Sequence, residues 1–526
     1  MGMGETADVI VLGGGLGGCM AALAAAKTGL RVLLTEETDW LGGQLTSQAV
    51  PPDEHPWIEN FGCTRTYREF RDRVRNYYRD HYPLKEDVRS QSNLNPGNGW
   101  VSRICHEPKV ALRILEDMLA PYVSSGRITL MYHCRPVSAV SNGDTVESVD
   151  VQSEKTGVVV TLKAKMFIDA TECGDLLPLA GVEYVSGAES RSETGEPHAP
   201  EQADPLDMQS ITHVFAMDYI EGGDYTIPKP EQYEFWRSYV PPYTSEPMFG
   251  WLIPNVAKEG EMREIPFMPN GKDPMPLWTY RRIIDAAQFE EGFFESDITL
   301  VNWSQNDYFL GPIYGVSEEE RRKNLEGARQ LSLSLVHWLQ TEAPRPDGGR
   351  GYPGIRFRKD VLGTEDGLAK HPYIRESRRI KAVQTITEFD VSKELRGDQG
   401  LRRYDDSVGV GFYFLDLHPT TRTNRMCYIP SVPYEIPLGA LLPIRVKNVL
   451  PACKNIGTTQ IANGCYRLHP TEWNIGESAG YLAAYAVRHG IAPHQVREEA
   501  IHLESFLELI RSEGIENHWP SDDLQW

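Results

Sequence analysis

No stretch of this sequence is apolar over the roughly twenty residues that a membrane-spanning helix needs. The N-terminus also lacks a basic segment followed by a long apolar core, so we expect no secretory signal. Basic residues are outnumbered by acidic ones, and the formal net charge of −21 argues against nucleic acid and anionic membrane surfaces as partners. We therefore expect a cytoplasmic protein that binds neither nucleic acid nor membranes.

The eight cysteines form no C-x-x-C pair, the spacing that is typical of zinc sites and redox dithiols. In a large chain without a secretory signal, isolated cysteines are typically reduced and buried as small apolar residues. We therefore predict no metal site and no disulfide framework. The 526 residues, 40% of them hydrophobic and 24% charged, have the composition of a globular protein that can bury a large core.

One glycine-rich segment, between Asp8 and Glu36, has a clear organisation. An apolar strand at 9–12 leads into glycines spaced G-x-G-x-x-G, an alanine-rich helix follows, and a second strand ends at Glu36. This order is typical of a βαβ unit that binds a dinucleotide: the first glycine makes the tight turn, the second admits the pyrophosphate, and the third lets the helix pack on the strand. The residues of this turn that we expect at the cofactor are Gly13, Gly15, Leu16, Gly17 and Gly18.

Glu36 stands where such units place an acid that accepts a hydrogen bond from a ribose 2′-hydroxyl. An acid at this position disfavours a 2′-phosphate, so the fingerprint predicts NAD or FAD rather than NADP. The helix N-terminus adds unpaired N–H groups and a positive dipole end for the phosphates. A simple glycine-rich turn is the alternative, but the complete order of strand, glycines, helix, strand and acid disfavours it.

A second glycine loop, Gly42-Gly43, follows this acid. Here the sequence resembles the FAD-dependent oxidoreductases of the glutathione-reductase-like superfamily, in which a Gly-Gly loop runs along the pyrophosphate and the flavin. A surface turn is the alternative for this loop. The resemblance implies FAD as the cofactor, and it implies cofactor contacts at Glu37, Gly42, Gly43, Gln44 and Leu45.

Two later segments continue the resemblance. Strand-like stretches between about 128 and 165 predict a β-meander, and the position of the superfamily's adenine-facing strand implies a contact at Val137. Residues 168–175, Ile-Asp-Ala-Thr-Glu-Cys-Gly-Asp, match the motif with which the chain returns to the cofactor. This match implies contacts at Ala170, Thr171 and Asp175, although Asp175 fits a helix cap equally well.

The middle of the chain lacks any nucleotide signature and is rich in proline and aromatic residues. We interpret it as a substrate domain that is inserted between two halves of the cofactor domain. Ser317 and the acids that follow it predict a helix that continues to about Ala343.

Arginine-rich segments occur at 57–82 and 371–380. Both fit the solvated face of a helix, since Arg375 would lie beside Arg378 and Arg379 at helical spacing, with Glu376 compensating their charge. A substrate-binding patch is the alternative interpretation of each.

Near the C-terminus, a strand at 448–452 precedes an alanine-rich helix. In the superfamily a glycine-bearing helix start at this place points at the flavin, which implies cofactor contacts at Asn474, Ile475 and Gly476. The motif here is Gly-Glu-Ser-Ala-Gly where Gly-Gln-Ala-Ala-Gly is common, so Glu477 would add an anion near the flavin.

These motifs together resemble the family of bacterial and fungal proteins known simply as FAD-dependent oxidoreductases, some of them misnamed xanthan lyase. The resemblance implies an α/β fold: a Rossmann-like FAD-binding domain of the glutathione-reductase type with an inserted α+β substrate domain. The four motifs lie at 9–45, 166–181, 371–380 and 436–485. The predicted boundaries are 1–182 for the first part of the FAD-binding domain, 183–400 for the substrate domain, and 401–526 for the return to the FAD-binding domain and the C-terminal helices.

Only one G-x-G-x-x-G is present, whereas reductases with two dinucleotides need a second one for NAD(P)H. The sequence therefore predicts an oxidase or dehydrogenase that takes a hydride from a small polar substrate to flavin N5. A C–H bond beside a hydroxyl or amino group needs a base for the leaving proton, and His418 is the first candidate, with His469 second. Arg378 and Tyr308 are candidates for binding a substrate carboxylate or hydroxyl.

Alternatives remain open at this stage. His418 could simply hold the turn before Pro419. The protein could instead be a flavin-dependent monooxygenase reduced by NAD(P)H or a partner reductase, a lyase or hydrolase, or a flavin-binding scaffold without activity. The substrate, the electron acceptor (oxygen or a redox partner), covalent flavin attachment and the oligomeric state, with a homo-oligomer as one option, are not determined by the sequence.

Overall fold

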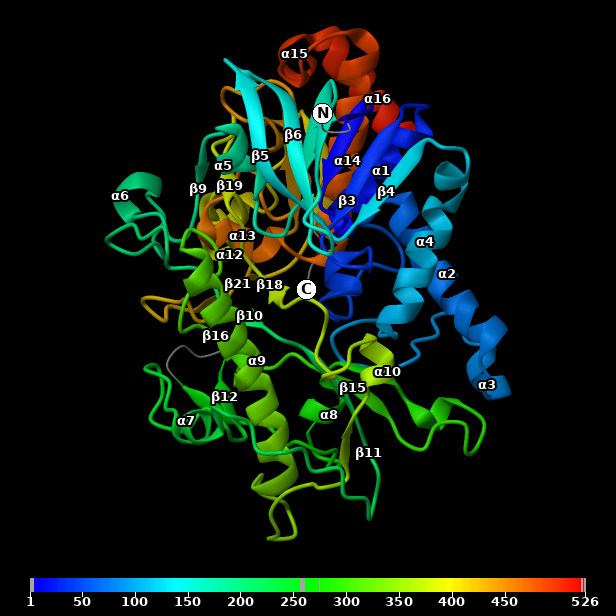
Figure 1. Cartoon of the computed structure of the whole chain (residues 1–526), viewed down its shortest axis with the longest axis vertical. Coiled ribbons are helices and arrows are strands. Elements are labelled where there is room, and N and C mark those ends of the chain that lie inside the picture. The colour runs from blue at the N-terminus through cyan, green and yellow to red at the C-terminus, as the bar shows by residue number, and fades with distance from the viewer. Residues whose placement is uncertain (1–3, 256–260, 274, 522–523, 525–526) are drawn as a thin grey trace.

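The computed structural model describes residues 4–255, 261–273, 275–521 and 524. Figure 1 shows the beginning and the end of the chain together in the upper half of the molecule, with most of the middle below them. The long helix α9 (Glu318–Thr341) runs through the lower half. No helix in the described part of the chain combines the length and the apolar composition that crossing a membrane requires.

A five-stranded parallel sheet forms the centre of the upper half, in the order β24-β8-β2-β3-β4. All four residues of β2 are buried, because a parallel sheet is covered on both faces and its strands are then apolar throughout. The edge strand β24 comes from the far end of the chain, so the sheet is complete only when the chain returns. The strands are β2 (Val9–Leu12), β3 (Val32–Glu36), β4 (Ile128–Tyr132), β8 (Met166–Asp169) and β24 (Val449–Pro451).

Alternate residues of β2 face two different layers. Val9 and Val11 belong to the core that includes the helices, whereas Ile10 and Leu12 belong to a second core under the meander. The helices on the first face are α1 (Leu16–Lys27), α4 (Pro108–Ser124) and α14 (His469–His489). The meander consists of β5 (Cys134–Asn142), β6 (Thr145–Ser153) and β7 (Val159–Lys163), with β1 (Gly4–Thr6) parallel to the last of these. This arrangement confirms the predicted Rossmann-like α/β architecture.

The inserted region has its own mixed architecture. Its main sheet has the order β14-β15-β11-β17, and α9 packs beside it with Ser317 as N-cap, whose hydroxyl accepts from the Glu320 N–H at 3.2 Å. The strands are β11 (Phe215–Tyr219), β14 (Arg282–Ile284), β15 (Ile298–Val301) and β17 (Ile355–Phe357). Ile283 and Leu300 of this region also belong to the core of the central sheet, so the domain boundaries at 182 and 400 remain a prediction.

The arginine-rich segment 371–380 differs from the predicted solvated helix face, and the segment 57–82 differs in part, since it forms a helix in which two arginines, Arg71 and Arg75, are buried. Residues 371–380 are extended, with the short strands β18 (Tyr373–Ile374) and β19 (Arg379–Ile380), and their arginines are largely buried. In helix α2 (Arg65–His81), Arg71 is only 1% exposed and pairs with Glu54 at 2.8 Å. Buried carboxylate partners, which the local sequence pattern does not reveal, are the physical reason for both differences.

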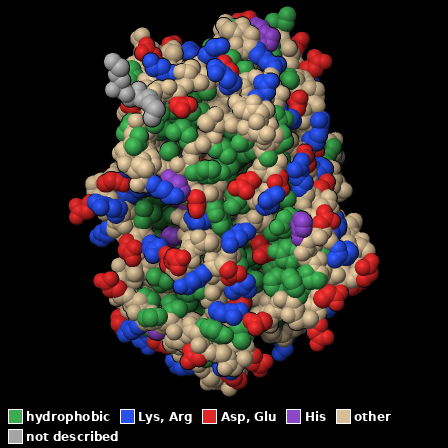
Figure 2. Space-filling model, turned by 45° about the vertical axis from the view of Figure 1, so that its right-hand side comes forward, with side chains coloured by type: hydrophobic (Ala, Val, Ile, Leu, Met, Phe, Trp, Pro, Cys, Tyr) green, Lys and Arg blue, Asp and Glu red, His purple; other side chains and the backbone are tan. Residues whose placement is uncertain are grey.

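All eight cysteines are free and most are buried, as predicted. On the face shown in Figure 2, acidic and basic side chains are interspersed, with hydrophobic side chains between them.

Candidate functional site

The turn between β2 and α1 is built from glycines whose missing side chains bring backbone segments together. Gly13 has a φ of +96°, and a Cβ there would lie 2.3 Å from the Ala170 carbonyl oxygen. A Cβ on Gly18 would lie 1.9 Å from the Gly13 carbonyl oxygen, so glycine is what lets α1 start this close to β2. Gly15 is the N-cap of α1 and has no side chain that could cap the helix, so a carboxylate distant in the sequence meets the positive end instead: Glu472 accepts from the Gly17 N–H at 3.3 Å.

Glu36, the last residue of β3, carries its carboxylate into this turn. Its Oε2 accepts from the Gly14 N–H at 3.0 Å, and its Oε1 accepts from the Thr38 N–H at 2.8 Å. Burial raises the pKa of Glu36 to about 7, although the hydrogen bonds from Thr38 lower it. The Gly42 N–H donates to the Gly14 carbonyl at 2.8 Å, so the second glycine loop lies directly against the fingerprint turn.

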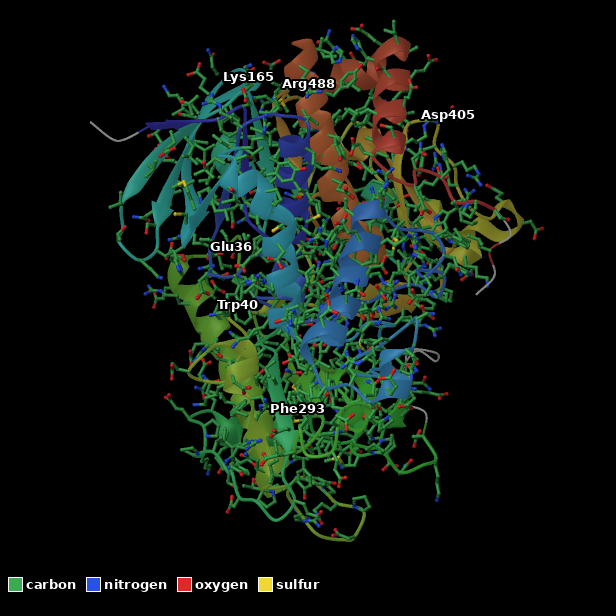
Figure 3. All side chains as sticks on the ribbon, turned by 90° about the vertical axis from the view of Figure 1, so that its right-hand side faces the viewer. Glu36, Trp40, Lys165, Phe293, Asp405 and Arg488 are labelled. Atoms are coloured by element: carbon green, nitrogen blue, oxygen red, sulfur yellow. The ribbon has the colours of Figure 1, made fainter. Side chains whose placement is uncertain are left out.

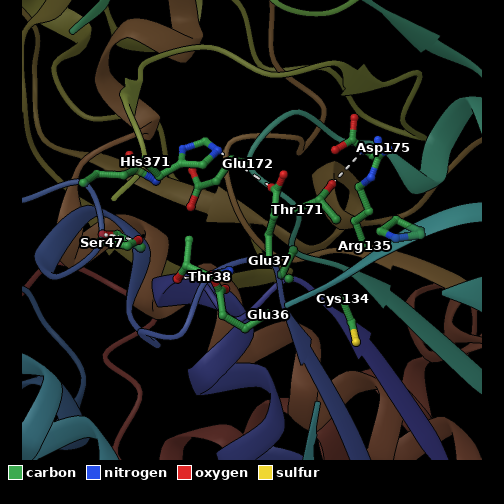
Figure 4. A pocket seen from close by; sticks show the side chains of 16 residues that line it. Glu36, Glu37, Thr38, Ser47, Cys134, Arg135, Thr171, Glu172, Asp175 and His371 are labelled. Carbon is green, nitrogen blue, oxygen red and sulfur yellow. Dashed lines mark hydrogen bonds and ion pairs between the residues drawn. The ribbon is translucent and has the colours of Figure 1, made fainter. Parts of the chain in front are cut away.

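A pocket with about 460 Å³ of empty space, part of it open to solvent, lies in front of these glycines. Figure 4 shows Glu172 and His371 on one side of it and Asp175 and Arg135 on the other. In Figure 3, Glu36 lies near the junction between the upper and lower parts of the molecule. The pocket is lined by Gly13, Gly15, Glu36, Glu37, Thr38, Gly43, Ser47, Gln48, Cys134, Arg135, Pro136, Ala170, Thr171, Glu172, Asp175 and His371.

Eight of the residues predicted at the cofactor are therefore in this lining: Gly13, Gly15, Glu36, Glu37, Gly43, Ala170, Thr171 and Asp175. Leu16, Gly17, Gly18, Gly42, Gln44 and Leu45 lie in the same turn and loop without lining it. On the meander strand, the lining residues are Cys134, Arg135 and Pro136 rather than the predicted Val137. Asp175 is the N-cap of a short helix but makes no side-chain cap, and its carboxylate pairs with Arg378 at 2.9 Å.

The C-terminal motif lies in the molecule differently from the prediction. Helix α14 begins at His469, so Gly476 is inside the helix and not at its start. A Cβ on Gly476 would lie 2.1 Å from the Gly17 carbonyl oxygen, which makes this glycine a close crossing point between α14 and α1. Asn474 donates to the Val408 carbonyl at 3.0 Å, and Ile475 is fully buried. Glu477 is buried next to Thr64 and Thr66, and burial raises its pKa to about 7.

A buried chain of charged groups, which no sequence motif indicated, lies at the edge of the cofactor cradle. By this cradle we mean the fingerprint turn together with the Gly42-Gly43 loop. Lys454, which follows β24 and is 1% exposed, pairs with Glu172 and lies 3.4 Å from a carboxylate oxygen of Glu472. Glu472 also accepts from the Gly17 N–H at 3.3 Å and from the Gln44 amide. Opposite charges and backbone donors thus stabilise a group of ions that burial alone would disfavour.

These residues fit a dinucleotide with a diphosphate. A Cβ on Gly15 or on Gly43 would lie 2.8 Å or 2.7 Å from Oε1 of Glu172, so that side chain occupies the space above the two glycines. The same oxygen is buried without a hydrogen-bond partner in the described structure. A diphosphate would find glycine backbone, the start of α1 and a nearby lysine there once the Glu172 carboxylate has moved aside.

His418 lies between two carboxylates. Its Nδ1 is 2.6 Å from Oδ2 of Asp307, and its Nε2 is 3.4 Å from Oδ2 of Asp416. Burial and Arg375 lower the pKa of His418, but the two carboxylates outweigh them and the pKa is raised. Asp307 also pairs with Arg375 at 2.9 Å, whereas the His418 side chain keeps 26% of its surface exposed and is accessible to a ligand.

The other three catalytic candidates do not join His418. Tyr308 donates to Asn324 at 3.1 Å and packs under α9, because it points to the opposite side of strand β16 (Asp307–Tyr308) from its neighbour. Arg378 lies at the cofactor pocket with Asp175. His469 is fully buried: its Nδ1 accepts from the Asp53 N–H at 3.1 Å and its Nε2 is 3.2 Å from the Val50 carbonyl. Both of its nitrogens are therefore already used by the backbone.

Arg467 connects the His418 site to the cofactor loop. Its carbonyl accepts from the Gln44 amide at 3.0 Å, and its guanidinium lies 3.3 Å from Asp416. It also donates to the Tyr373 hydroxyl at 2.8 Å. The segment 302–308, which combines polar and aromatic residues, contributes Asp307 to the site. No group of three or more potential metal ligands occurs in the part of the chain that the structure describes.

A model of the family described as "FAD dependent oxidoreductase" matches residues 8–506. A search of curated proteins found no match.

Solved structures match with low identity and low TM-scores. A myxobacterial chondrochloren halogenase is 12% identical, with coverage of 97% of this chain and 80% of that chain at a TM-score of 0.33. A mutant quinol fumarate reductase of E. coli is 10% identical, covering 97% of this chain and 74% of that chain, also at 0.33. For the L-proline dehydrogenase from P. horikoshii the identity is 15% and the TM-score 0.18, and the match spans 36% of this chain and only 24% of that one.

Proposed function

The chain belongs to the FAD dependent oxidoreductase family, and from this premise we propose that it oxidises a small polar substrate whose reacting carbon bears a hydroxyl or amino group. When bound, FAD would supply the acceptor, at flavin N5, for the hydride that leaves this carbon. The protein's own residues would bind the cofactor, orient the substrate and take up the proton that its hydroxyl or amino group loses.

The glycine cradle and the residues around it would hold the cofactor. Gly13, Gly15 and Gly43 would admit the diphosphate to the backbone, and the start of α1 would face its charge. Glu36 would accept from the ribose hydroxyl, exchanging its present bond from Thr38 or from Gly14 for the new one. Lys454 would balance the added negative charge once Glu172 has moved.

His418 is the proposed base. Its short bond to Asp307 fixes the tautomer in which Nδ1 carries the hydrogen, and Nε2 is left with only a long contact to Asp416. A substrate hydroxyl or amino group could replace that contact and give its proton to Nε2. Asp307 would then stabilise the imidazolium that forms, while Arg375 keeps this carboxylate ionised.

The observation that carries the proposal is the pair Asp307–His418, joined through Asp416 and Arg467 to the cofactor loop. A histidine oriented by a buried carboxylate within a few contacts of the cofactor cradle is what proton abstraction beside a hydride acceptor needs.

Anaerobic mixing tests the proposal. We expect the purified protein to show flavin absorbance that bleaches with at least one member of a panel of hydroxy and amino compounds. His418→Ala should reduce the rate of bleaching by about 10²–10⁴-fold, the usual contribution of a general base. His81→Ala, at the exposed end of α2, is the matched control and should leave the rate unchanged.

Two results would contradict the proposal. Unchanged bleaching in His418→Ala would remove this residue from the mechanism. A flavin that only NAD(P)H reduces, with oxygen then inserted into a substrate, would replace the oxidase or dehydrogenase with a monooxygenase.

A further inference from the structure

Among the described residues, the buried arginines near the His418 site each have several hydrogen-bond partners, with one exception. Arg375, 2% exposed, has four partners: Asp307 at 2.9 Å, the Thr212 hydroxyl at 2.9 Å, the Ser210 carbonyl at 3.0 Å and the Asn302 amide oxygen at 3.2 Å. Arg467 and Arg379 are each bound to a carboxylate and to backbone carbonyls. These contacts occupy most of the N–H donors of each guanidinium, as burial requires, although the Nε of Arg375 and that of Arg467 have no hydrogen-bond partner in the described structure.

Arg281 is the exception. It is 7% exposed, and within the described structure its one ion pair is a long contact of 3.5 Å to Asp53. Its Nε is buried without a hydrogen-bond partner. The guanidinium lies 5.2 Å from the ring centre of Tyr280, which stabilises the charge weakly but accepts few of its hydrogens. A buried cation with this many unused donors is costly for stability, so its retention points to a ligand.

The place of Arg281 makes that ligand a partner of the His418 site. Asp53, Arg467 and Asp416 are near enough to one another for their charges to shift each other's pKa, and Asp416 lies 3.4 Å from His418. Tyr280, Tyr373 and Tyr413 lie close to Arg281 and supply hydroxyl groups and ring surface. Three cations, Arg281, Arg375 and Arg467, face the three carboxylates of Asp53, Asp307 and Asp416, so the charges of the group balance while His418 is neutral.

We propose that Arg281 receives the carboxylate of the substrate, so that the substrate is a small carboxylic acid with an oxidisable hydroxyl or amino carbon. This inference rests on the proposed function, because it assigns the carboxylate and the reacting carbon to one molecule that extends from Arg281 towards His418. A carboxylate suits the position since it accepts two parallel N–H bonds from one guanidinium. Arg281 would exchange its contact with Asp53 for one with the substrate carboxylate.

Calorimetric titration of the purified, flavin-loaded protein tests binding separately from turnover. Lactate, malate and alanine are the anionic probes, and lactamide and 1,2-propanediol are neutral counterparts of lactate. We expect at least one acid to bind and its neutral counterpart to bind at least tenfold more weakly. Arg281→Gln should weaken binding of the acid at least tenfold, whereas Arg113→Gln, a surface arginine of α4 with 61% of its side chain exposed, should leave it unchanged.

A second variant with the opposite expected sign separates binding from folding. Asp53→Asn frees Arg281 from its present partner, so it should strengthen binding of the same acid severalfold, which a purely structural arginine would not do. Arg281→Gln should also leave the thermal midpoint of the ligand-free protein unchanged, because the substitution removes only one long ion pair.

Equal binding of the acid by wild type and Arg281→Gln would overturn the inference, as would a wild-type protein that binds none of the acids. Bleaching of the flavin by neutral compounds alone would overturn it while leaving the proposed oxidation intact. If acids bind to the protein in an Arg281-dependent way but no compound reduces its flavin, the carboxylate site is supported and the proposed oxidation is contradicted.

Discussion

His418 shows how partners from distant segments change a single side chain. The sequence placed it in a loop before a proline, where holding a turn and acting as a base were equally good interpretations. The structure adds Asp307 at 2.6 Å and Asp416 at 3.4 Å, and these carboxylates raise the pKa of His418 against the effects of burial and of Arg375. The tertiary contacts therefore decide the charge of this residue near neutral pH.

This raised pKa gives a pH dependence with a definite sign. Since a base must first have lost its proton, the rate of flavin reduction should rise with pH, with a midpoint above 6.5. Asp307→Asn removes a carboxylate that raises the pKa of His418, so it should move the midpoint to lower pH. The pH profile of anaerobic bleaching measures this shift. Asp117→Asn, on the surface of α4, is the control, and equal midpoints in all three proteins would contradict the assignment.

Helix α14 shows that the same motif can have a packing role that its sequence does not reveal. The sequence predicted that Gly476 marks the start of a helix pointing at the flavin. The helix instead begins seven residues earlier, at His469, and Gly476 lies against Gly17 of α1. Both helices carry glycine at the crossing because only then can their backbones approach so closely.

Gly476→Ala should therefore destabilise the protein and loosen its cofactor site together. A Cβ at this position would lie 2.1 Å from the Gly17 carbonyl, and overpacking of this kind costs about 1–3 kcal/mol. We expect a lower thermal midpoint and faster loss of flavin on dilution. Gly250→Ala is the control, since its nearest neighbour would be 3.8 Å away. A midpoint equal to that of the control would show that the helices can move apart without cost.

The whole molecule is organised by the return of the chain to its first sheet. β24, near residue 450, adds the edge strand beside β8, and Lys454 follows directly after it. This closure brings Lys454 next to Glu172, which the pairing of β8 with β2 places beside the glycines of the fingerprint turn. The cofactor cradle is thus made of three segments that are far apart in the sequence.

Glu172 should oppose the cofactor that this closure prepares for. Its carboxylate occupies the space above Gly15 and Gly43, and a diphosphate there must displace it or face its charge. Glu172→Gln should tighten FAD binding about tenfold, which is about 1.4 kcal/mol, with the dissociation constant measured by quenching of flavin fluorescence. Glu69→Gln, an exposed acid on α2, should behave like the wild type. Weaker binding in Glu172→Gln would show that the carboxylate helps to hold the cofactor.

Local physics explains which features were predictable. Strand, glycine turn, helix and second strand at 8–36 are set by neighbouring residues: glycine alone tolerates the φ of Gly13 and the close approach at Gly18 without strain. The helix from Ser317 is likewise fixed by its own cap. The conformation of the arginines at 371–380 was not predictable in this way, because the same charges suit an exposed helix and a buried strand with carboxylate partners equally well.

The sequence by itself thus determined the dinucleotide turn, the α/β architecture and the family, since these depend on short-range geometry and on contiguous motifs. The tertiary structure decided which residues meet: Asp307 at His418, Lys454 and Glu172 at the cradle, and Arg281 left almost without a partner. The reason is that a charge is defined by its neighbours, and those neighbours come from segments that only chain closure brings together.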